Sequence, residues 1–97
     1  MYFDMDVQDA IIKYNSLDSE KDYSQRSNIY AKEIHPAFDK LCENIINTFK
    51  FTYFDDPFED VKNEVVSFMV MQIPKYQPDK GRAFSYFSIV GKNYLIL

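Results

Sequence analysis

The chain has 97 residues, of which 46% are hydrophobic and 18% aromatic, and its formal net charge is −4. This length allows one small domain, and the apolar content excludes a disordered chain. Two glycines and four prolines supply few turns for many short strands, and the single cysteine excludes an internal disulfide framework, so we predict an all-α protein from a reducing compartment.

The first predicted helix covers residues 4–14. Acidic residues begin it, and its apolar side chains recur at helical spacing, at Val7, Ala10, Ile11 and Tyr14. Residues 15–27 are polar and lack periodicity, so we expect a mobile linker there. The sequence thus predicts a short helix with its linker in residues 1–27 and a helical domain in residues 28–97.

The second predicted helix carries the clearest apolar stripe. Its members recur every three or four residues and are Ile34, Phe38, Leu41, Ile45 and Phe49. Either this helix begins at Pro36, or an earlier turn from about Asn28 is kinked there. Cys42 lies on the stripe and is expected to pack. His35 has no metal-ligand or nucleophile partner at a recognisable spacing, so we expect it at the boundary or the surface.

The third predicted helix has a defined start and end. Asp56 is the predicted N-cap, Pro57 the first helical residue and Glu59 the reciprocal arm of a capping box. The apolar pattern continues to about Ile73, where Pro74 ends the helix.

A turn and a fourth helix complete the chain. Residues 76–81 are predicted to turn, with Pro78 and Asp79 at the bend and Gly81 free to adopt a positive φ. The last helix runs from about Ala83 to the end of the sequence. Because no C-cap residue or polar finish follows, we expect the natural protein to continue beyond Leu97.

The third helix is predicted to have two different faces. One broad side is core and carries Val61, Val65, Phe68, Met69 and Ile73. The opposite side is acidic and polar, with Met71 among its residues and Val70 beside them; its other members are Asp60, Asn63, Glu64 and Ser67. This side is either a surface for a basic partner with an adaptable apolar contact, or a solvated helix face.

The last quarter of the chain is basic and aromatic. Residues 75–97 hold four Lys or Arg and one acid, a charge of +3, whereas residues 1–74 hold seven basic and fourteen acidic residues, a charge of −7. Its aromatic residues include Tyr76, Phe84, Tyr86, Phe87 and Tyr94. Cations beside aromatic rings suit single-stranded nucleic acid, which needs phosphate neutralisation and stacking faces. The alternative is a surface element whose aromatic rings belong to the core.

Several functions are excluded by missing patterns. The sequence has no phosphate-binding glycine loop, no Cys/His metal spacing and no pair of residues placed for acid–base catalysis, so neither an enzyme nor a cofactor is expected. No apolar run reaches the roughly 18–20 residues of a membrane span, and no signal-peptide pattern begins the chain. We therefore expect a soluble, cytoplasmic binding protein without a membrane partner.

Asp60-Val-Lys-Asn63-Glu64 is followed by Lys75-Tyr76-Gln-Pro-Asp-Lys80-Gly81 and then by Phe84-Ser85. This pattern resembles the second conserved region of bacterial RNA polymerase sigma factors. In that family an acidic helix with Asp-x-x-Gln-Glu leads into a Lys-Phe/Tyr-Asp turn and then a glycine two or three residues before Phe-Ser. The short acidic N-terminal helix and residues 83–96 are most similar to the late-transcription sigma factors of tailed phages.

The resemblance implies two binding surfaces. In the family the acidic helix docks on the clamp helices of the largest subunit of core RNA polymerase, and the residues expected to do so here are Asp60, Asn63, Glu64, Ser67, Val70 and Met71. The aromatic helix captures unpaired non-template bases of an A·T-rich minus-ten promoter element. The residues expected to contact DNA are Tyr76, Lys80, Arg82, Phe84, Tyr86, Phe87, Lys92 and Tyr94. Phe87 matches the aromatic on which the key adenine stacks, and such stacking is worth about 1–3 kcal/mol per base.

The chain also departs from the family. Val90 and Gly91 replace the paired tryptophans that wedge the duplex, Tyr94 replaces a glutamine that reads double-stranded DNA, and Asn63 replaces the docking glutamine. Phage late sigma factors with this abbreviated pattern rely on a coactivator and on a sliding clamp that contacts a C-terminal tail, which is absent from this sequence.

The sequence therefore predicts a compact domain of three principal helices, like sigma region two, with a short additional N-terminal helix. We expect a transcription initiation factor in the cytoplasm of a bacterial host cell, which binds core RNA polymerase and promoter DNA. The alternative is a helical protein–protein adaptor that does not bind DNA and whose Tyr86, Phe87 and Tyr94 are buried.

Overall fold

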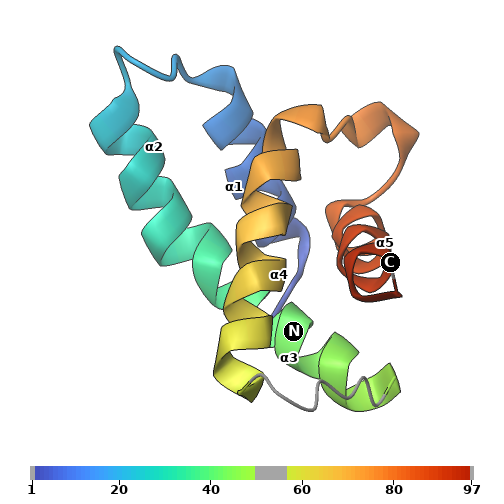
Figure 1. The fold of residues 1–97 in the computed structure, drawn as a ribbon. Helices are drawn as coiled ribbons and strands as arrows, with labels where there is room; N and C mark the ends of the chain where they lie inside the picture. Colours follow the sequence, from blue (N-terminus) through green and yellow to red (C-terminus); the bar gives the residue numbers. More distant parts are fainter. Residues whose placement is uncertain (1, 50–56, 97) are drawn as a thin grey trace.

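The computed structural model describes residues 2–49 and 57–96, and every regular element in those ranges is a helix. In chain order the elements are α1 (Met5–Ser16), α2 (Tyr23–Ile29), the π-helical turn η1 (Tyr30–Ile34), α3 (His35–Phe49), α4 (Phe58–Gln72), the 3₁₀ turns η2 (Ile73–Lys75) and η3 (Pro78–Lys80), and α5 (Ala83–Ile96). The predicted all-α fold is thus confirmed (Figure 1).

Helix α1 forms where the sequence predicts it. The side chain of Asp4 accepts hydrogen bonds from the backbone N–H groups of Asp6 and Val7, at 3.0 and 3.3 Å, and so caps the helix. Val7 and Ile11 are buried on its inner face. The cap and the apolar stripe are both local signals, which is why this helix was predictable.

Part of the predicted linker in residues 15–27 is helical, because α2 begins at Tyr23. The turn before it is ordered by Asp18, whose side chain accepts from the N–H groups of Glu20 and Lys21, both at 2.8 Å. Arg26 of α2 lies over the ring of Tyr14 at 4.1 Å and donates to the Tyr14 carbonyl. The expectation of a linker up to residue 27 is therefore wrong, since contacts with α1 fix a polar segment that shows no periodicity.

The first of the two alternatives for Pro36, a helix that begins there, is wrong. The chain is helical well before Pro36, and η1 joins α2 to α3 without a break. In η1 the N–H of His35 bonds to the carbonyl of Tyr30, five residues back. This wider turn makes room for the proline ring, which in a regular α-helix would clash with the carbonyl four residues earlier.

Helix α4 begins at Phe58, one residue later than predicted, and Pro57 occupies the N-cap position. The predicted N-cap Asp56 lies outside the described residues. The helix ends at Gln72, and the following η2 contains Pro74, as expected from a residue that cannot continue the helix. Gly81 has a φ of +149°, so the positive φ predicted for the turn before α5 is confirmed.

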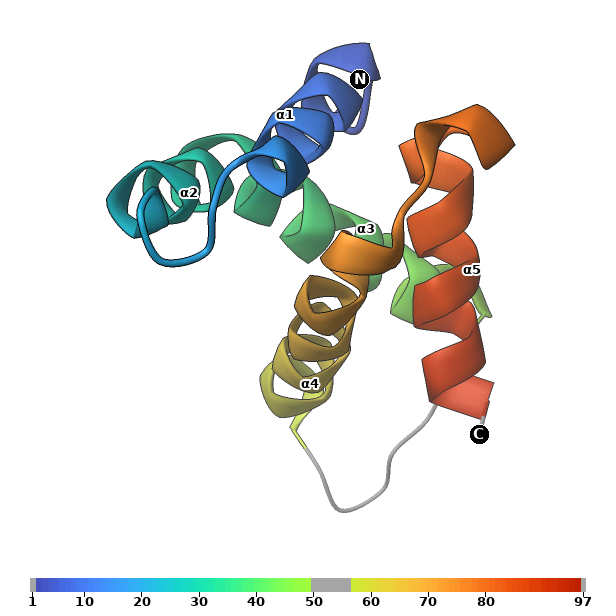
Figure 2. The same cartoon turned by 90° about the horizontal axis from the view of Figure 1, so that it is seen from above.

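The core forms around α3. In Figure 2 this helix runs through the middle of the molecule, with α1 and α2 on one side of it and α4 and α5 arranged around the other. The predicted stripe residues Ile34 at the end of η1 and Phe38, Leu41 and Ile45 of α3 are all buried, and the side chain of Phe49 lies outside the described part. Cys42 is also buried, and its thiol lies 3.6 Å from the sulfur of Met69 on α4.

Gly91 has a packing role in the α4–α5 contact. A Cβ added to Gly91 would lie 2.6 Å from Cε of Met69 and 3.1 Å from Cδ1 of Ile45. The absence of a side chain therefore lets α5 approach α3 and α4 closely. This close packing explains why position 91 is a glycine, where the sequence resemblance indicated only that a tryptophan is missing.

None of the helices described is both long and apolar enough to cross a membrane.

Candidate functional site

The acidic side of α4 forms one wall of a shallow groove, here called the acidic groove. It has a volume of about 550 Å³ and is lined by Asp60, Asn63, Glu64, Ser67, Phe68 and Met71 of α4 and by Tyr94 of α5. Five of the six residues predicted to bind polymerase therefore lie together. The sixth, Val70, is half-buried and packs against the core instead.

The acidic groove combines charge with apolar surface. Asp60 and Glu64 are exposed, and 69% of Met71 is accessible to solvent. The ring centroids of Phe68 and Tyr94 lie 4.9 Å apart, so the two helices share an aromatic floor. Such a surface suits a partner that carries basic groups beside an apolar side chain.

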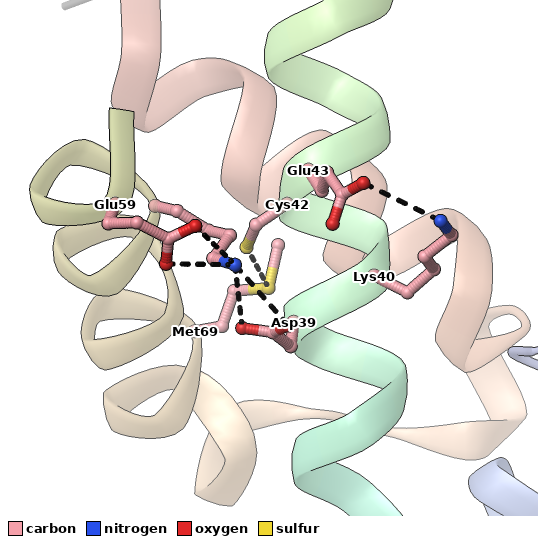
Figure 3. Close-up of polar contacts among 7 residues, drawn as sticks. Asp39, Lys40, Cys42, Glu43, Glu59 and Met69 are labelled. Carbon is pink, nitrogen blue, oxygen red and sulfur yellow. Dashed lines mark hydrogen bonds and ion pairs between the residues drawn. The ribbon is translucent and has the colours of Figure 1, made fainter. Parts of the chain in front are cut away.

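An ion-pair cluster around a buried lysine joins α4 to α3 and was not foreseen from the sequence. Lys62 of α4 is buried, and its Nζ lies 3.2 Å from Oε2 of Glu59 and 3.4 Å from Oδ1 of Asp39 on α3. Figure 3 shows the two carboxylates converging from the two helices. A lysine three residues after a glutamate suggests an exposed helical pair, whereas the contact with Asp39 depends on the packing of α3 against α4.

The two carboxylates keep Lys62 charged. Burial lowers the pKa of Lys62, but the hydrogen bond to Glu59 and the charge of Asp39 outweigh that effect, so its pKa is raised above the ordinary value of 10.5. Glu59 therefore pairs with a lysine one turn later in the helix. The cluster links the start of α4 to α3 and so helps to fix the helix that carries the acidic groove.

The connection from α4 to α5 forms a second recess, here called the basic pocket. It has a volume of about 390 Å³ and is lined by Lys75, Tyr76, Gln77, Lys80, Gly81, Arg82, Ser85, Tyr86 and Ile89. Three of these side chains are cationic and exposed, and none of the described residues that line the pocket is acidic. An anionic ligand would therefore meet a favourable field here.

Aromatic residues form one wall of the basic pocket. The hydroxyl of Tyr76 donates to the carbonyl of Gly81 at 2.8 Å, which bridges the turn, and burial raises the pKa of Tyr76. The rings of Tyr76 and Tyr86 lie 5.6 Å apart. Tyr86 is half-buried and remains in part accessible from the pocket. Behind it lies Phe87, whose ring meets that of Tyr86 edge-on at 4.9 Å.

The eight residues predicted to contact DNA are not all brought together. Tyr76, Lys80, Arg82 and Tyr86 line the basic pocket. Phe84 and Lys92 line a separate apolar groove between α3 and α5, and Tyr94 lies in the acidic groove.

Phe87 was predicted as the principal stacking ring, but no part of it is accessible to solvent. Its ring lies 4.8 Å from that of Phe38, and the rings of Phe3 and Tyr76 also surround it. In this conformation Phe87 supports the pocket wall from within the core and offers no face to a base.

A comparison with protein-family models, curated proteins and solved structures found no match for the chain.

Proposed function

We propose that this chain is a sigma-like transcription initiation factor that binds core RNA polymerase and an A·T-rich promoter element. One observation carries the proposal: two recesses of opposite charge occur on one small helical domain, one on α4 and one on the connection that follows it. The sigma factor motif assigns an acidic docking surface and a basic aromatic surface to these same two segments. The expected location is the cytoplasm of a bacterial host, where both partners are found.

The acidic groove is the proposed polymerase surface. Asp60 and Glu64 would face basic residues of the clamp helices, while Met71 and the Phe68–Tyr94 floor would contact an apolar side chain. Opposite charge gives such an interface its orientation and speeds its formation, and the apolar contact adds affinity.

The basic pocket is the proposed DNA surface. Lys75, Lys80 and Arg82 would neutralise phosphates, and the accessible part of Tyr86 would pack against an unpaired base. Because the whole chain carries a charge of −4, free protein is expected to bind DNA weakly, and the polymerase complex is the appropriate setting for measurement.

The polymerase contact is tested by a pull-down with purified core enzyme. The variant Asp60→Ala/Glu64→Arg should lose binding, because it replaces attraction with repulsion in the groove. The matched control Asp9→Ala/Glu33→Arg makes the same change in net charge at exposed sites on α1 and η1. Equal retention of the groove variant and wild type, or no binding by wild type, would contradict the proposal.

The DNA contact is tested with an A·T-rich single strand bound to the polymerase complex. Lys80→Ala/Arg82→Ala should weaken binding and reduce its dependence on salt, since two phosphate contacts are removed. Lys13→Ala/Lys32→Ala removes two exposed cations elsewhere and serves as the control. The same affinity for both variants would leave the basic pocket without a role in DNA binding.

A second candidate, a helical adaptor that binds only proteins, is favoured by the complete burial of Phe87. An adaptor would retain the effect of the groove variant in the pull-down. It would show no difference between the pocket variant and its control with DNA, so the two experiments together separate the candidates.

A further inference from the structure

Helix α1 contacts both ends of the connection between α4 and α5. The side-chain oxygen Oε1 of Gln8 accepts a hydrogen bond from the backbone N–H of Ala83 at 2.8 Å. The side-chain nitrogen Nδ2 of Asn15 donates to the carbonyl of Ile73 at 2.9 Å. The two amides are seven residues apart, which places them on the same side of α1, two turns from one another.

The N–H of Ala83 is one that a helix start leaves without an intrahelical partner, whereas the carbonyl of Ile73 also accepts from the Tyr76 N–H at 3.1 Å in η2. The N–H of Ala83 belongs to the first residue of α5, and the carbonyl of Ile73 follows the last residue of α4. Gln8 thus acts as a capping side chain for a helix 75 residues further along the chain. Between these points the Tyr76 hydroxyl bridges to Gly81, so the connection is held at both ends and across its middle.

This connection carries the cations of the basic pocket. Lys75, Lys80 and Arg82 all lie between Ile73 and Ala83, and their own side chains are exposed. Their positions therefore depend on where the backbone is held. Helix α1 itself is well anchored, because Phe3 just before it is buried and packs edge-on against Phe84 at 5.8 Å.

We infer that α1 is a positioning element for the basic pocket, in which Gln8 and Asn15 set the spacing of the pocket's cations without touching the ligand. The inference rests on the proposed function, because it assumes that the pocket binds single-stranded nucleic acid. Helix α1 lines neither the basic pocket nor the acidic groove. Its effect should therefore appear in DNA binding and leave polymerase binding unchanged.

Gln8 accepts a hydrogen bond whereas Asn15 donates one, so the same change from amide to carboxylate should affect the two contacts differently. Gln8 accepts, so Gln8→Glu keeps the acceptor and places a negative charge at the positive end of α5. Asn15 donates, and its Oδ1 is buried without a hydrogen-bond partner among the described residues. Asn15→Asp therefore removes the donor and directs a carboxylate at a carbonyl. Both variants change the net charge by the same amount.

The experiment measures amide hydrogen exchange in the free protein and affinity for an A·T-rich single strand in the polymerase complex. Asn15→Asp should speed exchange of the Tyr76 N–H, which bonds to the Ile73 carbonyl, by about fivefold and weaken DNA binding by a similar factor. Gln8→Glu should leave exchange of the Ala83 N–H slow and keep the affinity for DNA within about twofold of wild type. Gln8→Ala should instead speed exchange of the Ala83 N–H and weaken DNA binding, by factors similar to those expected for Asn15→Asp.

The controls are Gln25→Glu and Asn28→Asp, which alter exposed amides of α2 and should change neither reading. Should Asn15→Asp fail to fold, Asn15→Ala and Gln8→Ala carry the test. If wild type binds DNA and these variants bind equally well, or if Gln8→Glu and Asn15→Asp behave alike, the positioning role is overturned and the proposed function stands. If wild type itself does not bind DNA in the complex, the proposed function fails and this inference fails with it.

Discussion

The acidic groove and the basic pocket are built in different ways. Most of the groove is one face of α4, with Tyr94 as the single contribution from α5. The pocket is made by a connection with two short 3₁₀ turns and by the start of α5, and side chains of α1 bond to both ends of that connection. The residues of a surface on one helix can be predicted from their spacing in the sequence. A pocket whose backbone is held by residues far away in the sequence depends on the whole fold. Substitutions should therefore have more localised effects in the groove than in the pocket.

The largest expected effect compares the residues beneath the two surfaces. Phe87→Ala should lower the free energy of unfolding by about 3–5 kcal/mol, because the ring is completely buried among other aromatic rings. Phe68→Ala, at the half-buried floor of the groove, should lower it by only about 1 kcal/mol. Urea denaturation measures both values. Similar losses for the two variants would remove the distinction between a core residue and a surface floor.

The next effect concerns the contact that joins the two regions. Gly91→Ala should lower the free energy of unfolding by no more than about 1 kcal/mol, because the new methyl group must displace Cε of Met69, the flexible end of a buried side chain, while alanine itself favours the helix. Asn93→Ala, at an exposed site on the same helix, should be neutral or slightly stabilising.

The cause is checked by a double variant. Leucine lacks the Cε atom, so Gly91→Ala/Met69→Leu should recover part of the stability lost by Gly91→Ala, as a double-mutant cycle would record. A fully additive result would show that Met69 is not the obstacle to a side chain at position 91.

Alkaline pH should act mainly through two groups, the thiol of Cys42 on α3 and the phenol of Tyr30 on η1. Burial raises the pKa of Cys42 from 9.0 to about 12 and that of Tyr30 from 10.0 to about 12. Above about pH 9 the unfolded chain loses these protons while the folded chain keeps them, so stability should fall as the pH rises. The raised pKa of Lys62 acts in the same direction, since its contribution is complete below 10.5 and is lost as the pH passes through the folded value.

The pH effect is measured from urea midpoints between pH 7 and 10.5. Cys42→Ala should flatten the decline that begins near pH 9, even though the variant is less stable throughout. A decline of equal slope in wild type and variant would show that the thiol ionises equally easily in the folded and unfolded states.

The smallest effect compares the same substitution at the buried Lys62 of α4 and at the exposed Lys80 of the basic pocket. Lys62→Met should change the free energy of unfolding at pH 7 by no more than about 1 kcal/mol, because the cost of burying the lysine charge is lost together with its pairings, and the carboxylates left behind on Asp39 and Glu59 are accessible to water. Lys80→Met should leave stability within about 0.5 kcal/mol but weaken DNA binding in the polymerase complex. A large stability loss at position 80 would contradict its assignment to an exposed ligand-binding site.

The features that were predictable from the sequence are those that depend on local patterns. The Asp4-capped helix α1, the stripe on α3, the stop at Pro74 and the acidic face of α4 all follow from spacing and capping. The burial of Phe87 and the position of Tyr94 did not follow, because periodicity alone cannot assign the sides of α5, where apolar residues occur all round the helix.

The contacts between distant segments were even harder to predict from the sequence. Gln8 and Asn15 read as ordinary polar residues of an amphipathic helix, and their partners are backbone atoms 75 and 58 residues away. Arg26 and Lys62 likewise acquire their roles only when helices pack together. Such residues are predictable only once the arrangement of the helices is known.

The burial of Cys42 has a practical consequence for chemical labelling. Its thiol is inaccessible to solvent and stays protonated at neutral pH, so maleimides and disulfide-forming probes should react with it only slowly. It is also the only cysteine in the sequence. A cysteine introduced by M71C in the acidic groove, or by I89C in the basic pocket, would then be the one reactive thiol. Cross-linkers and spin labels can therefore be attached to either surface while the natural cysteine stays in place.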